Sequence, residues 1–313
     1  MFRRILRKRW RRNFAVAGLL VLLILLSAVG LLWKRLHREQ SPAAVQGPTI
    51  FQQELQSSEW NTISYTPARR LTVQTTSAGS TAMDFRLAAL DRTTAVDRSY
   101  FANVCFLGDS LTVGFSDYSI NLGGALICGY TGVGPDAIVN RSAVKSSVRG
   151  SEVAMDVLTA AQPKKLYILL GTNTLTTLGA ADRFLAYYGQ MLDQLRQALP
   201  GCVIYVQSIP PVRPQAAAEK PGLASDVLRS VNEQLAKLAA DKGCVYLDLW
   251  ETFADENGNL KEMLAAPDGV HFSAGNGYGA WVTYLRNHAK YSASNSWTCL
   301  LYTSDAADDL IGV

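Results

Sequence analysis

The chain has 313 residues, of which 30 are basic and 26 acidic, with a formal net charge of +4. Ten of the basic residues and none of the acidic ones lie in residues 1–38, which leaves 20 basic and 26 acidic residues, a net charge of −6, in the remainder. An acidic main part argues against nucleic acid and anionic lipid headgroups as partners, because both are themselves negatively charged.

The N-terminal segment is expected to anchor the chain in the cell membrane as a single pass. Residues 14–33 form an uncharged run of twenty residues, about the length of a helix that crosses a bilayer. Seven Lys and Arg residues precede this run and three follow it, so the positive-inside rule places residues 1–13 in the cytoplasm and the remainder outside. A cleaved signal peptide is the alternative, but its apolar core is normally only about 7 to 15 residues long.

The segments on either side of the main domain are expected to lie outside its core. Residues 34–97 are expected to form a stalk, because residues 39 to about 80 are rich in Gln, Ser and Thr, and a helix expected at 82–97 leads into the domain. Residues 293–313 form a tail, in which 299–309 resemble the translation of a transposon-based sequencing adapter. We therefore leave this tail out of fold and function, and expect the natural C-terminus to differ beyond about Thr298.

The part between them, residues 98–292, alternates short apolar runs with amphipathic stretches. The expected strands are residues 103–107, 125–128, 166–170, 202–208 and 245–248, and helices are expected near 180–199 and 224–241. This alternation is typical of an α/β domain with a parallel sheet. About 200 residues are enough for one core with helices on both faces of that sheet.

Ser110 is the candidate nucleophile. It follows the first expected strand, after Gly108, which lets the chain turn sharply where a helix must begin. A serine at that position lies at a helix N-terminus, whose free N–H groups favour the negative charge that develops in acyl transfer. Because a serine hydroxyl stays protonated at neutral pH, Ser110 needs a neighbouring base.

His271 is the expected base. Of the three histidines, His37 belongs to the basic flank of the membrane segment, and His288 falls near the end of an amphipathic stretch where a solvated surface position is expected. Asp268 stands three residues before His271, close enough for its carboxylate to accept the Nδ1 proton and leave Nε2 facing Ser110.

Four short segments together resemble the SGNH, or GDSL-type, hydrolase family of esterases and acylhydrolases. The matches are residues 108–111 (Gly-Asp-Ser-Leu) for the first block, Gly132 or, in another register, Gly134 for the second, residues 171–174 (Gly-Thr-Asn-Thr) for the third and residues 268–271 (Asp-Gly-Val-His) for the last. The resemblance covers about residues 98–290. It implies a flavodoxin-like, three-layer α/β/α fold whose parallel five-stranded sheet has the order 2-1-3-4-5.

The resemblance also implies an oxyanion hole made by the backbone N–H groups of Ser110 and Gly132 and the side-chain amide of Asn173. Glycine permits close approach of its N–H, and a carboxamide donates hydrogen bonds without a full charge. Thr174 replaces the Asp that is usual in the third block, which leaves open the alternative of an inactive binding module. Residues 132–137 also fit the dinucleotide fingerprint G-x-G-x-x-A, but they do not follow the first strand and no suitably placed acidic residue follows them.

Cysteines and charged loop residues give weaker signals. Cys105, Cys128, Cys202 and Cys244 lie in or beside apolar strands and are expected to be small buried side chains, with a bridge between Cys202 and Cys244 as the alternative. No metal site is expected, because the histidines are dispersed and the cysteines lack paired spacing. Arg213, in a proline-rich loop, is expected to have an ordinary structural role, and contact with an anionic substrate group is the alternative.

The sequence therefore predicts a carboxylic ester hydrolase that forms an acyl-enzyme on Ser110 and needs no cofactor. An outward-facing domain on a stalk favours O-acetyl esters of cell-wall or extracellular polysaccharide as substrates. A lysophospholipase or lipase-like acylhydrolase is the alternative, and transfer of the acyl group to a sugar is another, because the same residues serve both reactions. An apolar cleft would favour a lipid substrate, and polar, aromatic walls a sugar.

Overall fold

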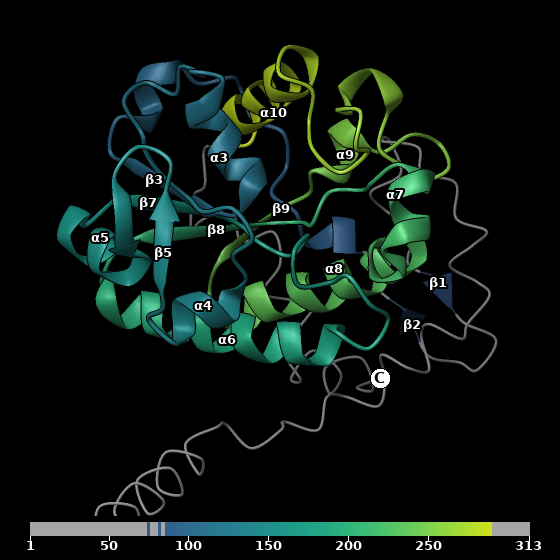
Figure 1. The fold of residues 1–313 in the computed structure, drawn as a ribbon, viewed down its shortest axis with the longest axis horizontal. Coiled ribbons are helices and arrows are strands. Elements are labelled where there is room, and N and C mark those ends of the chain that lie inside the picture. Colours follow the sequence, from purple (N-terminus) through teal and green to yellow (C-terminus); the bar gives the residue numbers. More distant parts are fainter. Residues whose placement is uncertain (1–73, 76–80, 83–84, 290–313) are drawn as a thin grey trace, which may run out of the picture. The chain divides into compact units, whose positions relative to one another are not determined.

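The computed structural model describes residues 74–75, 81–82 and 85–289 (Figure 1). The expected cytoplasmic segment 1–13, the expected membrane span 14–33, most of the expected stalk 34–97 and the tail 293–313 lie outside these residues. Within the described part of the chain, no helix is long and apolar enough to span a bilayer.

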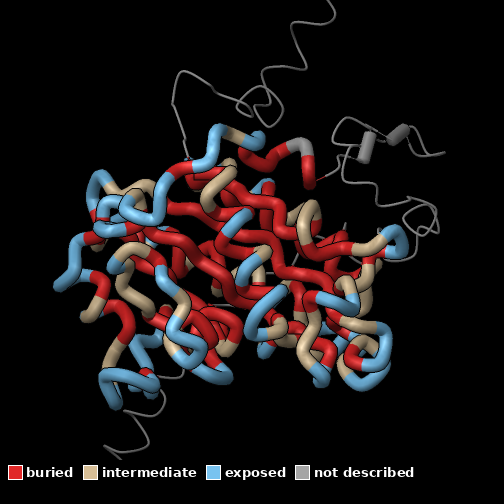
Figure 2. Tube along the Cα trace, turned by 90° about the horizontal axis from the view of Figure 1, so that it is seen from above, coloured by how far each residue is buried: buried red, intermediate tan, exposed pale blue. Residues whose placement is uncertain are grey.

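A parallel five-stranded sheet forms the centre of the domain, with its strands buried (Figure 2). Its strands, in spatial order, are β4 (Leu126–Gly129), β3 (Val104–Gly108), β7 (Lys165–Leu169), β8 (Val203–Gln207) and β9 (Val245–Leu247). Counted along the chain, this order is 2-1-3-4-5, so the sheet order implied by the family resemblance is confirmed. Each of the five expected strands starts and ends within one residue of the strand in the structure.

Helices cover both faces of this sheet (Figure 1). One face carries α3 (Ser110–Asp117) and α10 (Asn276–Asn287), and the other carries α4 (Pro135–Val139), α5 (Ala154–Ala161), α6 (Ala181–Ala198) and α8 (Ser225–Asp241). Two short helices, α7 (Pro214–Glu219) and α9 (Trp250–Phe253), follow the ends of β8 and β9. In α6 the buried side chains recur every three to four residues, which is the spacing of a helix with one apolar face.

Alternate residues of each strand point into two separate apolar cores. Cys105 and Leu107 of β3 face the core below α6 and α8, whereas Val104 and Phe106 face the core below α3 and α10. In the second core, the ring of Phe106 lies 5.0 Å from the ring of Tyr167, and Tyr167 stacks on Tyr205 at 4.3 Å. These three rings occupy aligned positions on three neighbouring strands, and their contacts stabilise the pairing of these strands.

Three features differ from the sequence-based expectations. Residues 82–97 do not form one helix: a 3₁₀ turn occupies Phe85–Ala88, Phe85 is buried in the core, and the Leu90 N–H donates to the Tyr246 carbonyl at 2.8 Å. This part of the expected stalk therefore packs into the domain. An antiparallel hairpin, β5 (Ala143–Ser146) and β6 (Gly150–Val153), was not expected, nor was the short pair β1 (Gln74–Thr75) and β2 (Thr81–Ala82).

One single-residue expectation is wrong, and the alternative of a cysteine bridge is excluded. His288 is buried rather than solvated: its ring stacks on Tyr284 at 4.0 Å, because this end of α10 packs into the second core. Cys202 and Cys244 do not form a bridge, and both are free thiols. Burial raises the pKa of each to about 11, so these side chains are uncharged at neutral pH.

Candidate active site

The strand register places the motif residues at one edge of the sheet. Gly108, the last residue of β3, is aligned with Gly129 of β4 on one side and with Leu169 of β7 on the other. Ser110, Gly132 and Asn173 follow these three aligned strand ends by two, three and four residues. They therefore meet at the carboxyl edge of the sheet, where open parallel α/β sheets bind ligands.

The turn between β3 and α3 requires glycine at Gly108. A Cβ atom built there would lie 2.0 Å from Thr112 Oγ1 and 2.5 Å from the Leu169 carbonyl oxygen. Any larger residue would push the first turn of α3 away from the sheet. This close approach lets α3 begin at Ser110, only two residues after the strand ends, and it fixes where the Ser110 hydroxyl emerges.

Asp109 is the buried residue that holds this turn together. Its carboxylate accepts a hydrogen bond from the Leu111 N–H at 3.1 Å, which caps α3, and another from Thr172 Oγ1 at 2.7 Å. The side chain is fully buried, and burial raises the pKa of Asp109, while the hydrogen bonds from Thr172 and Leu111 act in the opposite direction. Asp109 thus links the loop that carries Ser110 to the loop that carries Asn173.

His271 bridges Ser110 and Asp268, as expected from the sequence. Its Nε2 lies 2.7 Å from Ser110 Oγ, and its Nδ1 is hydrogen-bonded to Asp268 Oδ2. The other oxygen, Asp268 Oδ1, accepts from the backbone N–H groups of Val270 at 3.1 Å and His271 at 3.0 Å. Burial raises the pKa of Asp268, but the hydrogen bonds from His271 and the two backbone groups outweigh it, so that its pKa is lowered. The carboxylate therefore stays charged beside the imidazole at neutral pH.

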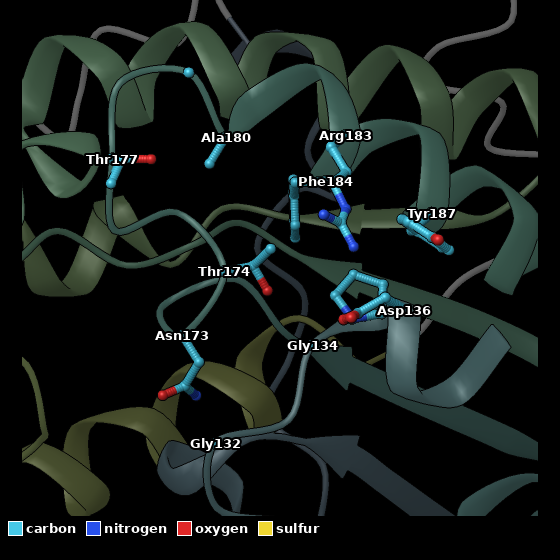
Figure 3. A pocket seen from close by; sticks show the side chains of 12 residues that line it. Gly132, Gly134, Asp136, Asn173, Thr174, Thr177, Ala180, Arg183, Phe184 and Tyr187 are labelled. Atoms are coloured by element: carbon cyan, nitrogen blue, oxygen red, sulfur yellow. The ribbon is translucent and has the colours of Figure 1, made fainter. Parts of the chain in front are cut away.

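Gly132 and Asn173 face a common open pocket with a volume of about 500 Å³ (Figure 3). Gly132 has a φ of +78°, and the position of its missing side chain is open. Gly134 has an ordinary φ of −115°, and a Cβ there would lie 2.4 Å from Thr174 Oγ1. Of the two glycine registers, Gly132 therefore has the backbone that favours glycine and faces free space, whereas Gly134 makes room for Thr174.

Arg213 supports the loop that carries Asp268 and His271. Its backbone N–H donates to the Gly269 carbonyl at 2.7 Å, and its guanidinium donates to the Leu260 carbonyl at 2.9 Å. Gly269 has a φ of +72°, and a Cβ there would lie 2.8 Å from Arg213 Cβ. Glu262 lies 3.7 Å from the guanidinium. These contacts support the structural role expected for Arg213 rather than contact with a substrate.

A model of the GDSL-like lipase/acylhydrolase family matches residues 106–278, which include all four motif segments. The chain belongs to this family. Among curated proteins, none matches it. The chain is also similar to three solved structures, each 16% identical to it. A GDSL-like lipase from Bacteroides thetaiotaomicron has a TM-score of 0.46, and the match covers 61% of this chain and 89% of that one. A lipase/acylhydrolase from Enterococcus faecalis (TM-score 0.41) and a carbohydrate esterase family 3 from Talaromyces cellulolyticus (TM-score 0.39) each match over 58% of this chain and 92% of their own.

This GDSL-like hydrolase is therefore a carboxylic ester hydrolase of α/β architecture, and its geometry suits acyl transfer. The Ser110 hydroxyl is hydrogen-bonded to the His271 imidazole, which is hydrogen-bonded to the Asp268 carboxylate. This arrangement allows a proton to leave Ser110 as its oxygen attacks an ester. Within the described residues, no group of three or more His, Cys, Asp or Glu side chains could hold a metal ion. Residues 132–137 form the loop and first turn after the edge strand β4, which is not the usual place of a dinucleotide fingerprint.

Two structural contributions to this site were missed at the sequence level. The hydrogen bond from Thr172 to Asp109 joins residues 63 positions apart, and no local pattern predicts such a pairing. An Asp directly before a helix is a typical capping residue, so the capping of α3 by Asp109 could have been predicted from the sequence. The support of Gly269 by Arg213 depends on the packing of two loops, and the sequence gives no signal for it.

Proposed function

We propose that this hydrolase is a membrane-anchored, extracellular serine esterase that removes acyl groups, chiefly O-acetyl, from cell-wall or extracellular polysaccharide. The observation that carries the proposal is the hydrogen-bonded series Ser110–His271–Asp268, which lies at the same sheet edge as the Gly132 and Asn173 pocket. The enzyme class follows from the family, and the residue roles and the substrate are our inference.

Acylation begins with Ser110. His271 Nε2, 2.7 Å away, removes the hydroxyl proton as Oγ bonds to the ester carbonyl carbon. Asp268 fixes the tautomer that has its proton on Nδ1 and stabilises the imidazolium that forms. The protonated His271 then gives its proton to the leaving alcohol oxygen, and the acyl group stays on Ser110. In the second half, His271 takes a proton from water as the water oxygen attacks the acyl carbon, and His271 then returns this proton to Ser110 Oγ as the bond between Oγ and the acyl carbon breaks and the acid leaves.

Both halves pass through an oxyanion, and the proposed donors for it are the N–H groups of Ser110 and Gly132 and the Asn173 amide. Asn173 is exposed, and its side chain lines the pocket beside Gly132 (Figure 3). Donors of this kind typically contribute about 10²- to 10³-fold each to kcat. Thr174 stands where Asp is usual, and its hydroxyl lies beside Gly134, since a Cβ built on Gly134 would be 2.4 Å from Thr174 Oγ1.

The pocket favours a polar leaving group over a long acyl chain. Six of its lining residues are hydrophilic or charged, namely Asp136, Asn173, Thr174, Thr177, Arg183 and Tyr187. An aliphatic chain would bury these groups without giving them hydrogen-bond partners, which is unfavourable. A sugar can satisfy them, and an acetyl group needs little space of its own.

The extracellular location and the anchor rest on the pattern of residues 1–38, as argued from the sequence. Deletion of residues 14–33 should shift the esterase activity of expressing cells from the membrane fraction to the soluble fraction. Activity that stays with the membrane after this deletion would contradict the anchor.

The test of the function compares the purified chain with its Ser110→Ala variant, and uses Ser116→Ala, in the same helix, as the matched control. We expect the wild type and Ser116→Ala to release acetate from acetylated xylan and p-nitrophenol from its acetate ester, and Ser110→Ala to lose at least about 10³-fold in kcat on both. Equal background rates in all three proteins would indicate a binding module. Turnover of lysophosphatidylcholine without acetate release from xylan would indicate a lipid acylhydrolase.

A further inference from the structure

The pocket beyond the proposed oxyanion donors contains two opposite charges from two different helices. Asp136 lies in the first turn of α4, and Arg183 lies near the start of α6, the helix against which α4 packs. Both side chains line the pocket, and Figure 3 shows the Arg183 guanidinium directed into it. Gly132 and Asn173, the proposed oxyanion donors, line the same pocket.

Neither of these charges has a charged partner among the described residues. No ion pair or side-chain hydrogen bond involves the Asp136 carboxylate or the Arg183 guanidinium within residues 85–289. Other surface charges in the domain do pair, as Arg149 does with Glu152 and Lys242 with Asp193. The guanidinium does lie near an aromatic ring: Arg183 Cζ is 5.6 Å from the ring centroid of Tyr187, one helical turn further along α6.

The chemistry of these groups defines what they can bind together. A guanidinium only donates hydrogen bonds, and a carboxylate only accepts them. A ligand that satisfies both must accept at one point and donate at another, as two neighbouring hydroxyl groups do. An anion would pair with Arg183 but would be repelled by Asp136 in the same pocket. The Tyr187 ring adds a flat apolar surface with a polar tip.

We propose that Asp136, Arg183 and Tyr187 form a subsite for a neutral sugar ring that carries the ester. In this subsite Arg183 donates to one ring hydroxyl, Asp136 accepts from a neighbouring one, and Tyr187 packs beside the ring. This assignment rests on the proposed function, and it adds the residues that distinguish a sugar ester from other acetate esters. Gly132 and Asn173 line the same pocket, so a ring held there has its acetyl group beside the oxyanion donors.

The experiment uses methyl glycosides of glucose, galactose, xylose and N-acetylglucosamine, each with one O-acetyl group. Each substrate is paired with an analogue in which every remaining hydroxyl is O-methylated. The full chain is compared with Arg183→Gln and Asp136→Asn, and Arg141→Gln and Asp156→Asn serve as matched controls, because these two residues pair with each other on the exposed surface away from the pocket. Thermal melts confirm that each variant is folded.

For at least one sugar, we expect wild type and both controls to prefer the free hydroxyls over the methylated analogue by at least tenfold in kcat/KM. Arg183→Gln and Asp136→Asn should each reduce this preference to threefold or less. The subsite is overturned if both variants keep the preference, or if wild type deacetylates the sugars without any preference. If wild type hydrolyses p-nitrophenyl acetate but none of the sugar esters, the proposed function itself fails, and the subsite with it.

Discussion

Asp268 is the residue whose role in the site is defined most fully by its hydrogen bonds. One oxygen accepts from the imidazole and the other from two backbone N–H groups, so the carboxylate is held in one orientation although its side chain is half-exposed. The Asp268→Asn variant keeps the shape of the side chain but places an amide beside His271 Nδ1. An amide N–H there favours the tautomer that has its proton on Nε2, which cannot accept the Ser110 proton. We expect kcat on p-nitrophenyl acetate to fall by about 10²- to 10⁴-fold with the fold intact. A loss below threefold would show that Asp268 does not orient His271.

The lowered pKa of Asp268 predicts a pH dependence of stability. Because the folded-state pKa lies below the unfolded one, the charged carboxylate stabilises the fold above the unfolded pKa, and this contribution is lost as the pH falls through the folded pKa. The effect is small, because solvent screens a half-exposed group. We expect the Tm of wild type to exceed that of Asp268→Asn at pH 7, and the difference to shrink below the ordinary pKa of 3.8. A difference that grows on acidification would contradict this sign.

Asp109 is expected to contribute mainly to stability. Asp109→Ala removes the cap of α3 and leaves the buried Thr172 hydroxyl without its acceptor. Loss of a cap typically costs about 0.5 to 2 kcal/mol, and loss of the Thr172 hydrogen bond adds to it. We expect urea unfolding to show a decrease of about 2 kcal/mol, whereas Asp117→Ala, at the exposed end of the same helix, should change the free energy of unfolding by less than about 0.5 kcal/mol. Equal effects of the two substitutions would argue against the capping role.

At the scale of elements, the loops after the strands determine where the functional groups lie. The loop with Asp268 and His271 is held by the segment that follows β8, through Arg213. This arrangement couples two loops that are more than 50 residues apart in the chain.

Arg213→Met tests this coupling. It keeps an apolar stem of similar length but leaves the buried Leu260 carbonyl without its donor, which typically costs about 1 to 3 kcal/mol. We expect kcat/KM to fall by a similar factor, about tenfold, on a neutral acetate ester and on one with a carboxylate in its alcohol part. A raised KM for the anionic ester alone would instead show that Arg213 binds substrate.

The regular elements could be predicted from sequence wherever their hydrophobic pattern is strong. The strands of the sheet are mainly apolar runs, as is typical of parallel strands covered on both faces, and α6 and α8 have clear helical periodicity. The hairpin β5–β6 was missed because its two short strands contain few large apolar residues, with only Val144 and Val153 among them. Residues 85–90 were assigned to the stalk because their contacts with the domain, such as those of Phe85 with Tyr246 and Trp250, join segments far apart in the chain and leave no local pattern.

At the scale of the whole molecule, the candidate site combines residues from both ends of the domain. Ser110 and His271 are 161 residues apart, and they meet because β3, which lies between β4 and β7, ends at the same edge of the sheet to which the last loop returns. The sequence predicted this meeting, since the motif order and the chemistry of a serine nucleophile both require a base. It did not predict the pocket walls, because the meeting of Asp136 with Arg183 and Tyr187 depends on how α4 packs against α6.

The central claim is that Ser110, activated by His271, is the nucleophile of this hydrolase. The most direct test is to react the full chain with a fluorophosphonate ester and to locate the adduct by mass spectrometry of its peptides. We predict stoichiometric modification of Ser110 in wild type and little or none, over the same time, in folded His271→Ala. An unmodified Ser110 in folded wild type, or an adduct on another residue, would contradict the account.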